Sequence, residues 1–320
     1  MTKKVCLSLL LVWGILLGSG CASLSKTDNS TRDLPWRLSA VLPHEDQSYW
    51  CQMAEGMQEE AALHNVSLKV RIPAMNYNVE QMTDLIRQEI ASHTDALLVQ
   101  GIDDPDYMAA LLEAQEAGIK VALVDTNVQE LPDHIYVGTD NYLAGRTMGD
   151  ALLKQTKGTV NAVILSGDEG YPNLEERIRG IQDAVGESGR VRILGTEYDD
   201  FDSITVLERF RYILKHYPEV NTILAVEGTG CMSLGISLDE LPDPLTCIIG
   251  FDDCPESLMG MEKGIVSGLM LQDSREMGRK AVELLADGLE TRNMAYGEYY
   301  TDSGYLSQAE YLSEKEGGAQ

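Results

Sequence analysis

From Trp36 onward, the sequence alternates between short apolar runs and longer segments with apolar residues at helical spacing. The apolar runs have the length and composition of β-strands, and they lie at residues 37–42, 67–72, 95–100, 119–124, 134–138, 160–165, 191–195, 221–226, 245–251 and 266–271. Several runs are apolar on consecutive residues, which is typical of strands covered on both faces in a parallel sheet. The alternation predicts an α/β protein.

The segments between these runs predict helices that cover such sheets. Met82, Ile86 and Ile90 fall on one helical face, and Gly118 ends another helical pattern before the next strand. Ten strands are too many for one usual open sheet and suit two sheets of about five or six strands. We therefore expect two Rossmann-like lobes, divided near residues 138–149, with a ligand cleft between the carboxyl ends of their strands.

The first residues of the chain predict a secretory signal. Lys3 and Lys4 precede an apolar stretch at residues 5–17, and three small residues follow it. The stretch is too short to be a usual membrane span and has the order of parts found in a signal peptide. We expect this signal peptide at residues 1–20.

Cys21 follows that segment and resembles the lipobox cysteine of bacterial lipoproteins, which is acylated and becomes the new N-terminus. Gly18 stands where the lipobox usually has a leucine-like residue. The resemblance implies a lipid anchor at Cys21 and a polar tether over residues 21–35. A plain cleaved signal without lipidation is the alternative.

Charge and hydropathy limit the partners of this chain. It carries 51 acidic and 25 basic residues, for a formal net charge of −26, and it has no basic stripe. A surface of this sign repels phosphate backbones, so we expect no nucleic-acid partner. No later apolar run is long enough to span a bilayer, so the part after Trp36 is expected to be soluble and outside the cell.

Four cysteines lie beyond the expected anchor: Cys51, Cys231, Cys247 and Cys254. No two of them form a C-x-x-C pair and no histidine cluster accompanies them, so we expect neither a metal nor a cofactor. Cys231 and Cys247 are interpreted as small core residues. A Cys247–Cys254 disulfide is the alternative outside the cell.

Polar and aromatic residues follow most of the predicted strands. They lie at residues 43–50, 101–106, 125–127, 137–141, 166–180, 198–203, 227–230, 250–253 and 271–274. Because the carboxyl ends of parallel strands meet at one edge of a sheet, we expect many of these side chains to face the cleft. Asp253 is expected to be solvated or to cap the helix that begins at Pro255.

The order and spacing of these motifs resemble the ribose/galactose-type periplasmic binding proteins, a type 1 family that shares its core with lac-repressor-type regulators. The resemblance covers roughly residues 36–289. It rests on AGIKVALVDTN, VGTDNYLAGRTMGDAL, ERIRGIQDAV, FDSITVLERFRYILKHYPEVNTILA and IIGFDDCPESLMGMEKGIVSGLMLQDSREMGRKAVELL.

The family fold implies two lobes, joined by three crossovers, that close on one small solute, usually a sugar. It places residues 36–139 and 273–298 in an N-terminal lobe. Residues 140–272 and 299–312 form the C-terminal lobe.

The resemblance also implies which aromatic residues contact the solute. Tyr49 and Trp50 fall where the family stacks aromatic rings on the ligand, and Phe201 falls on the aromatic residue of the second lobe. A sugar presents apolar C–H faces, and aromatic faces can cover them.

The same correspondence implies polar ligand contacts. Asp103 and Asp252 fall on carboxylates of the family, and Arg177 falls on the arginine that donates to sugar hydroxyls. Gln272 falls on an amide at a crossover. Hydroxyl groups both donate and accept, so a buried sugar needs carboxylates, amides and a forked guanidinium as partners.

Several positions depart from the family pattern. Thr126, followed by Asn127, replaces a common arginine, and Gln47 stands where an asparagine is usual. Glu227 and Thr229 belong to a stretch that replaces an Asn-Asp turn. With Gln47, Thr126, Asn127, Glu227 and Thr229 as pocket residues, the site loses a cation and gains a carboxylate. The ligand is therefore expected to carry an amine or to be a polyol unlike common hexoses.

Signal and resemblance together predict a monomeric, lipid-anchored protein on the extracellular face of the cell membrane, or in the periplasm if the cell has an outer membrane. It would deliver a sugar, polyol or amino sugar to an ABC importer. The alternative is a sensory module that presents its closed form to a membrane receptor such as a histidine kinase. An enzyme is not expected, because no G-x-S-x-G is present and the five histidines form no triad or metal spacing.

Overall fold

The computed structural model describes residues 34–45 and 47–317. The predicted signal peptide, Cys21 and the tether up to residue 33 lie outside the described residues. The described residues belong to one compact unit that begins at Leu34. Within them, no helix is both long enough and apolar enough to cross a bilayer.

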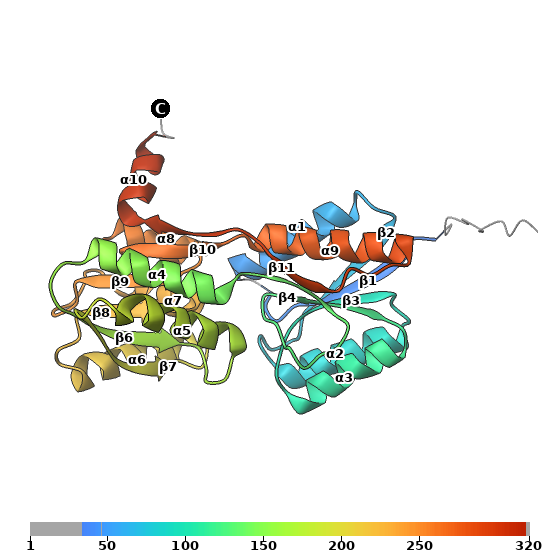
Figure 1. Cartoon of the computed structure of the whole chain (residues 1–320), viewed down its shortest axis with the longest axis horizontal. Helices are drawn as coiled ribbons and strands as arrows, with labels where there is room; N and C mark the ends of the chain where they lie inside the picture. The colour runs from blue at the N-terminus through green and yellow to red at the C-terminus, as the bar shows by residue number, and fades with distance from the viewer. Residues whose placement is uncertain (1–33, 46, 318–320) are drawn as a thin grey trace, which may run out of the picture. The chain divides into compact units, whose positions relative to one another are not determined.

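The first sheet has six parallel strands in the order β11-β5-β4-β3-β1-β2. The strands are β1 (Trp36–Val41), β2 (Val66–Arg71), β3 (Ala96–Gln100), β4 (Lys120–Val124), β5 (Ile135–Gly138) and β11 (Gly297–Tyr300). Helices α1 (Ser48–Ala61) and α9 (Ser274–Thr291) cover one face, and α2 (Val79–Ala91) and α3 (Pro105–Glu116) cover the other (Figure 1). Every residue of β3 is buried, as expected for a strand covered on both faces.

The second sheet also has six strands, in the order β12-β10-β9-β8-β6-β7. They are β6 (Val160–Ser166), β7 (Val191–Tyr198), β8 (Thr222–Ala225), β9 (Cys247–Phe251), β10 (Gly268–Gln272) and β12 (Ser303–Ser307), of which β12 is antiparallel to β10. Helices α4 (Asn141–Gln155) and α5 (Pro172–Gly186) cover one face, while α6 (Ser203–His216), α7 (Gly228–Ser237) and α8 (Pro255–Glu262) cover the other. Helix α10 (Gln308–Gly317) follows β12.

The chain passes between the two sheets three times: from β5 to β6, from β10 to β11 and from β11 to β12. The predicted fold class, two parallel α/β lobes joined by three crossovers, is therefore confirmed. One predicted boundary needs correction. Tyr299 and Tyr300 pair with Val137 and Gly138 in the first sheet, so the chain leaves that sheet after residue 300 and not after residue 298.

Strands β11 and β12 were not predicted from the sequence. Their sequences, GEYY and SGYLS, are not apolar runs, and most of their residues are exposed or half-buried. Both strands lie at an edge of their sheet, where burial imposes no continuous apolar pattern.

Glycines allow the helix pairs on the outer faces to approach closely. A β-carbon at Gly145 of α4 would lie 2.1 Å from the carbonyl oxygen of Arg177 on α5. One at Gly180 of α5 would lie 2.2 Å from the carbonyl oxygen of Tyr142 on α4. A β-carbon cannot approach another atom so closely, so only glycine at these two positions allows α4 and α5 to pack at this distance. The same packing sets the position of Arg177 on α5.

Candidate functional site

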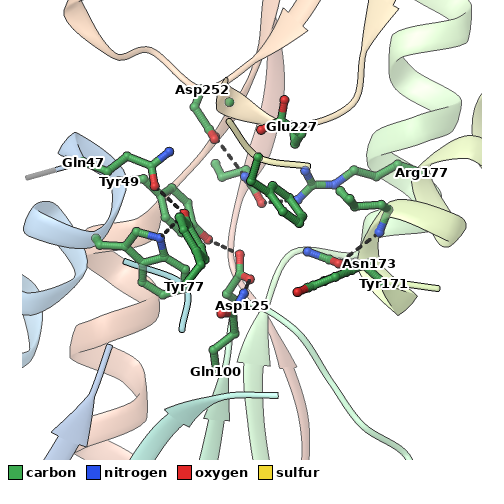
Figure 2. A pocket seen from close by; sticks show the side chains of 15 residues that line it. Gln47, Tyr49, Tyr77, Gln100, Asp125, Tyr171, Asn173, Arg177, Glu227 and Asp252 are labelled. Atoms are coloured by element: carbon green, nitrogen blue, oxygen red, sulfur yellow. Dashed lines mark hydrogen bonds between the residues drawn. The ribbon is translucent and has the colours of Figure 1, made fainter. Parts of the chain in front are cut away.

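A cavity of about 60 Å³ lies where residues from both lobes converge (Figure 2). The first lobe contributes Gln47, Tyr49, Trp50, Tyr77, Gln100 and Asp125, and the second contributes Tyr171, Asn173, Leu174, Arg177, Phe201, Glu227, Gly228, Asp252 and Gln272. The cavity has room for about four to six water molecules. That volume suits a solute of monosaccharide size.

Aromatic rings form one wall of the cavity and join the two lobes. Tyr49 and Trp50 meet edge to face with ring centroids 5.1 Å apart, and Trp50 Nε1 donates to the Tyr77 hydroxyl at 2.9 Å. The ring of Tyr77 stacks on Phe201 of the other lobe at 5.7 Å and 15°. Tyr171 meets Phe201 edge to face at 5.0 Å. Such rings offer flat apolar faces to the C–H surface of a small solute.

Backbone strain is concentrated at this cavity. Four of the eight non-glycine residues with positive φ in the described part line it: Tyr77 (56°), Asp125 (67°), Phe201 (54°) and Asp252 (64°). Each costs of order 1–3 kcal/mol and persists only where the surrounding structure holds it, most often at ligand clamps and active sites. The strain makes this cavity the candidate functional site.

Asp125 is the central polar group on the side of the first lobe. It comes directly after β4, and its Oδ1 accepts the Tyr49 hydroxyl at 2.8 Å. Its Oδ2 accepts Gln100 Nε2 at 3.0 Å and Thr126 Oγ1 at 2.7 Å. These three neutral donors hold the carboxylate in place at the floor of the cavity.

Arg177 supplies the guanidinium of the site and is only 2% exposed. Nε donates to Asn141 Oδ1, Nη1 to the Val226 carbonyl and Nη2 to Gln272 Oε1, each at 2.8 Å. Its carbon Cζ lies 4.0 Å from the centre of the Phe251 ring. A guanidinium has five N–H donors, so two remain for a ligand.

Asp252 comes directly after β9 and faces the same space. Its Oδ1 accepts Gln272 Nε2 at 2.9 Å, whereas no residue of the described part donates to its Oδ2. A β-carbon on Gly228 would lie 2.8 Å from that Oδ2, so the free oxygen rests against the first turn of α7. Burial raises the pKa of Asp252 to about 7, although Arg177 and the Gln272 amide oppose the shift.

Glu227 is the N-cap of α7 and is 6% exposed. Its Oε2 accepts the backbone N–H of Thr229 at 2.6 Å, and its Oε1 accepts that of Gly230. Burial raises the pKa of Glu227 in spite of these bonds. Fully buried Asp199 has a pKa raised by burial and by Glu227, and its Oδ2 has no hydrogen-bond partner in the described part.

Helices α1 and α5 begin at the cavity wall. Their N-cap residues, Gln47 and Tyr171, make no side-chain hydrogen bond to the first turn. The N-terminal ends of both helices therefore offer partial positive charge to ligand oxygens.

Most of the residues proposed from the sequence line the cavity. They are Gln47, Tyr49, Trp50, Arg177, Phe201, Glu227, Asp252 and Gln272. Arg177 forms no ion pair with the neighbouring Glu175 or Glu176, and Glu176 instead pairs with exposed Arg179.

Four proposed residues lie elsewhere. Asp103 is exposed, because β3 ends at Gln100 and the chain then turns into α3, with Asp104 as its N-cap. Thr126 is fully buried and donates to Asp125 without lining the cavity. Asn127 bonds to His134 and Glu298 beside a separate hollow, and Thr229 lines a wider hollow next to the cavity.

None of the cysteines of the described part lines the cavity. Cys247 and Cys254 are not bonded to each other, so the alternative of a Cys247–Cys254 disulfide is wrong. Cys254 Sγ lies 3.0 Å from Ser257 Oγ. No group of metal-ligating side chains able to hold an ion occurs among the described residues.

Sequence reasoning missed seven cavity residues: Tyr77, Gln100, Asp125, Tyr171, Asn173, Leu174 and Gly228. Gln100 ends β3 and Asp125 directly follows β4. The expectation that residues at the carboxyl ends of the strands face the cleft could therefore have identified both. Tyr171 and Asn173 lie where α5 begins, in a stretch already expected to face the cleft. Tyr77 lies in a loop whose direction the sequence does not encode locally.

Known proteins resemble this chain over most of its length. The family model described as a periplasmic binding protein domain matches residues 39–292. The ribose import binding protein RbsB of Escherichia coli (strain K12) is 22% identical over 261 residues, which cover 82% of this chain and 87% of RbsB.

Solved structures agree with the family match. GanP, a glucose-galactose binding protein from Geobacillus stearothermophilus, matches with a TM-score of 0.80 at 25% identity, over 86% of this chain and 98% of GanP. A chain from a structure described as the XylFII–LytSN complex matches with a TM-score of 0.75 at 22% identity, over 87% and 99% of the two chains. The chain therefore belongs to the type 1 periplasmic binding protein family, whose members are solute-binding proteins and not enzymes.

Proposed function

We propose that the protein captures one small sugar-like solute in the cavity between its lobes and delivers it to an ABC importer. The observation that carries the proposal is the lining of the cavity, which combines aromatic faces with a guanidinium, carboxylates and amides from both lobes. The names of RbsB and GanP, which bind ribose and glucose or galactose, support a sugar-like solute.

Closure of the lobes on the solute would be the mechanism. Asp125 and Gln100 belong to one lobe, and Arg177, Asp252 and Gln272 to the other, so a solute that contacts both sets favours the closed arrangement. Stacking of Tyr77 on Phe201 adds a contact between the lobes. An importer can then distinguish the loaded protein from the empty one by its shape.

The protein would act outside the cytoplasm as a lipoprotein. Periplasmic relatives support an extracytoplasmic location. The anchor itself is proposed from the sequence pattern around Cys21 alone. Metabolic labelling with a fatty acid, followed by comparison with Cys21→Ser, tests it: the label should be lost in the variant, and equal labelling would refute the anchor.

A second candidate is supported by the likeness to XylFII, whose structure was determined in a complex with LytSN. In that case the closed form would be presented to a membrane receptor such as a histidine kinase. Pull-down from membranes with saturating solute would separate the two roles, since one recovers an importer and the other a receptor.

A thermal-shift screen tests solute capture. The chain that starts at Leu34 is melted in the presence of pentoses, hexoses, polyols and their amino derivatives. A solute at one hundred times its dissociation constant stabilises by about 2.7 kcal/mol. Asp252→Ala should abolish the shift, whereas Asp253→Ala, which removes the exposed carboxylate next to it, should preserve the shift. A shift that survives Asp252→Ala would contradict the proposed site.

A further inference from the structure

The cavity has more anionic than cationic side chains. Asp125, Glu227 and Asp252 line it, and Arg177 is the one cationic residue among the described residues of the lining. Figure 2 shows Asp252 and Glu227 on one side of the cavity and Asp125 on the opposite side. With all of these groups ionised, the lining carries two negative charges in excess.

The three carboxylates are held by neutral donors. Tyrosine, glutamine and threonine side chains donate to Asp125, backbone N–H groups donate to Glu227, and an amide donates to Asp252. None of the three, nor Arg177, takes part in a salt bridge within the described part of the chain. Arg177 offsets only part of the cost of holding three carboxylates that form no salt bridge, because burial disfavours the charged form.

A cation from outside the protein would relieve this cost. A metal ion does not fit, because the described residues contain no cluster of ligating side chains that could hold one. Protons relieve part of this cost in the solute-free protein, as the raised pKa of Asp252 and of Glu227 shows, but a protonated carboxyl group loses both a negative charge and an acceptor for the solute. A cationic group on the solute remains, and the lining suits it, because Asp252 Oδ2 has no donor in the described part and five aromatic residues surround the space.

We propose that the solute carries a protonated amine on a polyhydroxyl frame, as in an amino sugar or an amino polyol, with the ammonium on the side of Asp252 and Glu227. This inference rests on the proposed function of the cavity in solute capture. The hydroxyls of the solute take the two remaining N–H groups of Arg177 and the N-terminal ends of α1 and α5. The ammonium supplies the missing counter-charge.

The electrostatics of the site agree with this assignment. Burial raises the pKa of both Asp252 and Glu227, because it disfavours their charged forms. An ammonium nearby favours the ionised carboxylates and lowers their pKa.

Matched solutes test the proposal. The chain that starts at Leu34 is titrated calorimetrically with amino derivatives of pentoses, hexoses and inositols, each beside its hydroxyl parent and its N-acetyl form. N-acetylation keeps the nitrogen and removes the charge. We expect at least one amine to bind at least tenfold more tightly than both of its neutral counterparts.

Other outcomes distinguish a failure of the amine proposal from a failure of the proposed solute capture. If a neutral parent binds as tightly as its amine, the proposal that the solute carries an amine is refuted, while the proposed solute capture is still supported. If no member of the panel binds, both are contradicted.

Charge variants provide the second test. Glu227→Gln and Asp252→Asn each remove one negative charge with little change in shape. Each substitution should weaken binding of the amine at least tenfold, and neither should weaken binding of the neutral parent by the same factor. Asp253→Asn removes an exposed charge in the same stretch and should leave both affinities unchanged. Equal losses for amine and neutral parent would show that the carboxylates act as plain hydrogen-bond acceptors and would overturn the proposal.

Discussion

Replacing Asp252 by asparagine should remove a pH dependence from the stability of the solute-free protein. Burial raises the pKa of Asp252 to about 7 in the folded protein, from a usual value of 3.8. Between these two values the unfolded chain has released the proton and the folded protein has kept it. Folding stability therefore falls as the pH rises through this window, and the loss is complete above pH 7.

The size of the effect follows from the two pKa values. Their difference corresponds to about 4 kcal/mol, at about 1.4 kcal/mol for each pKa unit. Asparagine cannot ionise. Between pH 4 and pH 8, the unfolding free energy of the variant should therefore rise by up to about 4 kcal/mol relative to that of wild type. A constant offset from the altered hydrogen bond with Gln272 cancels in this comparison.

Urea unfolding, followed by tryptophan fluorescence at several pH values, measures the difference. The protein is first unfolded and refolded to remove any bound solute. Asp287→Asn is the control, because its carboxylate is exposed on α9 and does not contribute to the raised pKa of Asp252, so its curve should stay parallel to that of wild type. If the Asp252→Asn curve is also parallel to wild type, the carboxyl group is not desolvated and the reasoning fails.

Three further substitutions and one control test the cavity and the frame around it. Gly145→Ala should destabilise the protein by about 1–3 kcal/mol and weaken solute binding, because the new β-carbon would meet the carbonyl oxygen of Arg177 at 2.1 Å. Gly186→Ala in the same helix pair meets no atom within 4 Å and should be neutral in urea unfolding. Phe201→Ala removes the stacking with Tyr77, worth about 0.5–1.5 kcal/mol beyond buried area, so small-angle scattering of the empty protein should show a larger radius of gyration than for wild type. Arg177→Lys keeps the charge but loses the fork that reaches three acceptors, so calorimetry should show at least tenfold weaker binding; unchanged affinity would exclude the guanidinium from the site.

The fold could be predicted because burial leaves a pattern in the sequence. Strands such as β3 and β9 are buried at every residue and therefore appear as uninterrupted apolar runs. Strands β11 and β12 pair at sheet edges with mostly exposed side chains, so no such pattern reveals them.

The site could be predicted where a residue follows directly from strand position and family resemblance, as Asp252 and Arg177 do. Thr126 was proposed because it replaces a common arginine of the family, and Asp125 before it was not proposed. Asp125 has a φ of 67°, a left-handed conformation that the local sequence does not reveal. Tyr77 has a φ of 56° and reaches the cavity from a loop, so its place depends on tertiary contacts with Trp50 and Phe201.

Mass spectrometry under native conditions tests whether this cavity captures one solute per chain. The protein is mixed with the tightest solute from the titrations, and the mass of the complex is measured. The account predicts one solute per chain in wild type and in Arg179→Ala, whose side chain is exposed on α5, and none in Arg177→Ala, which removes the buried guanidinium of the cavity. Retention of the solute by Arg177→Ala, or a stoichiometry other than one, would contradict capture in this cavity.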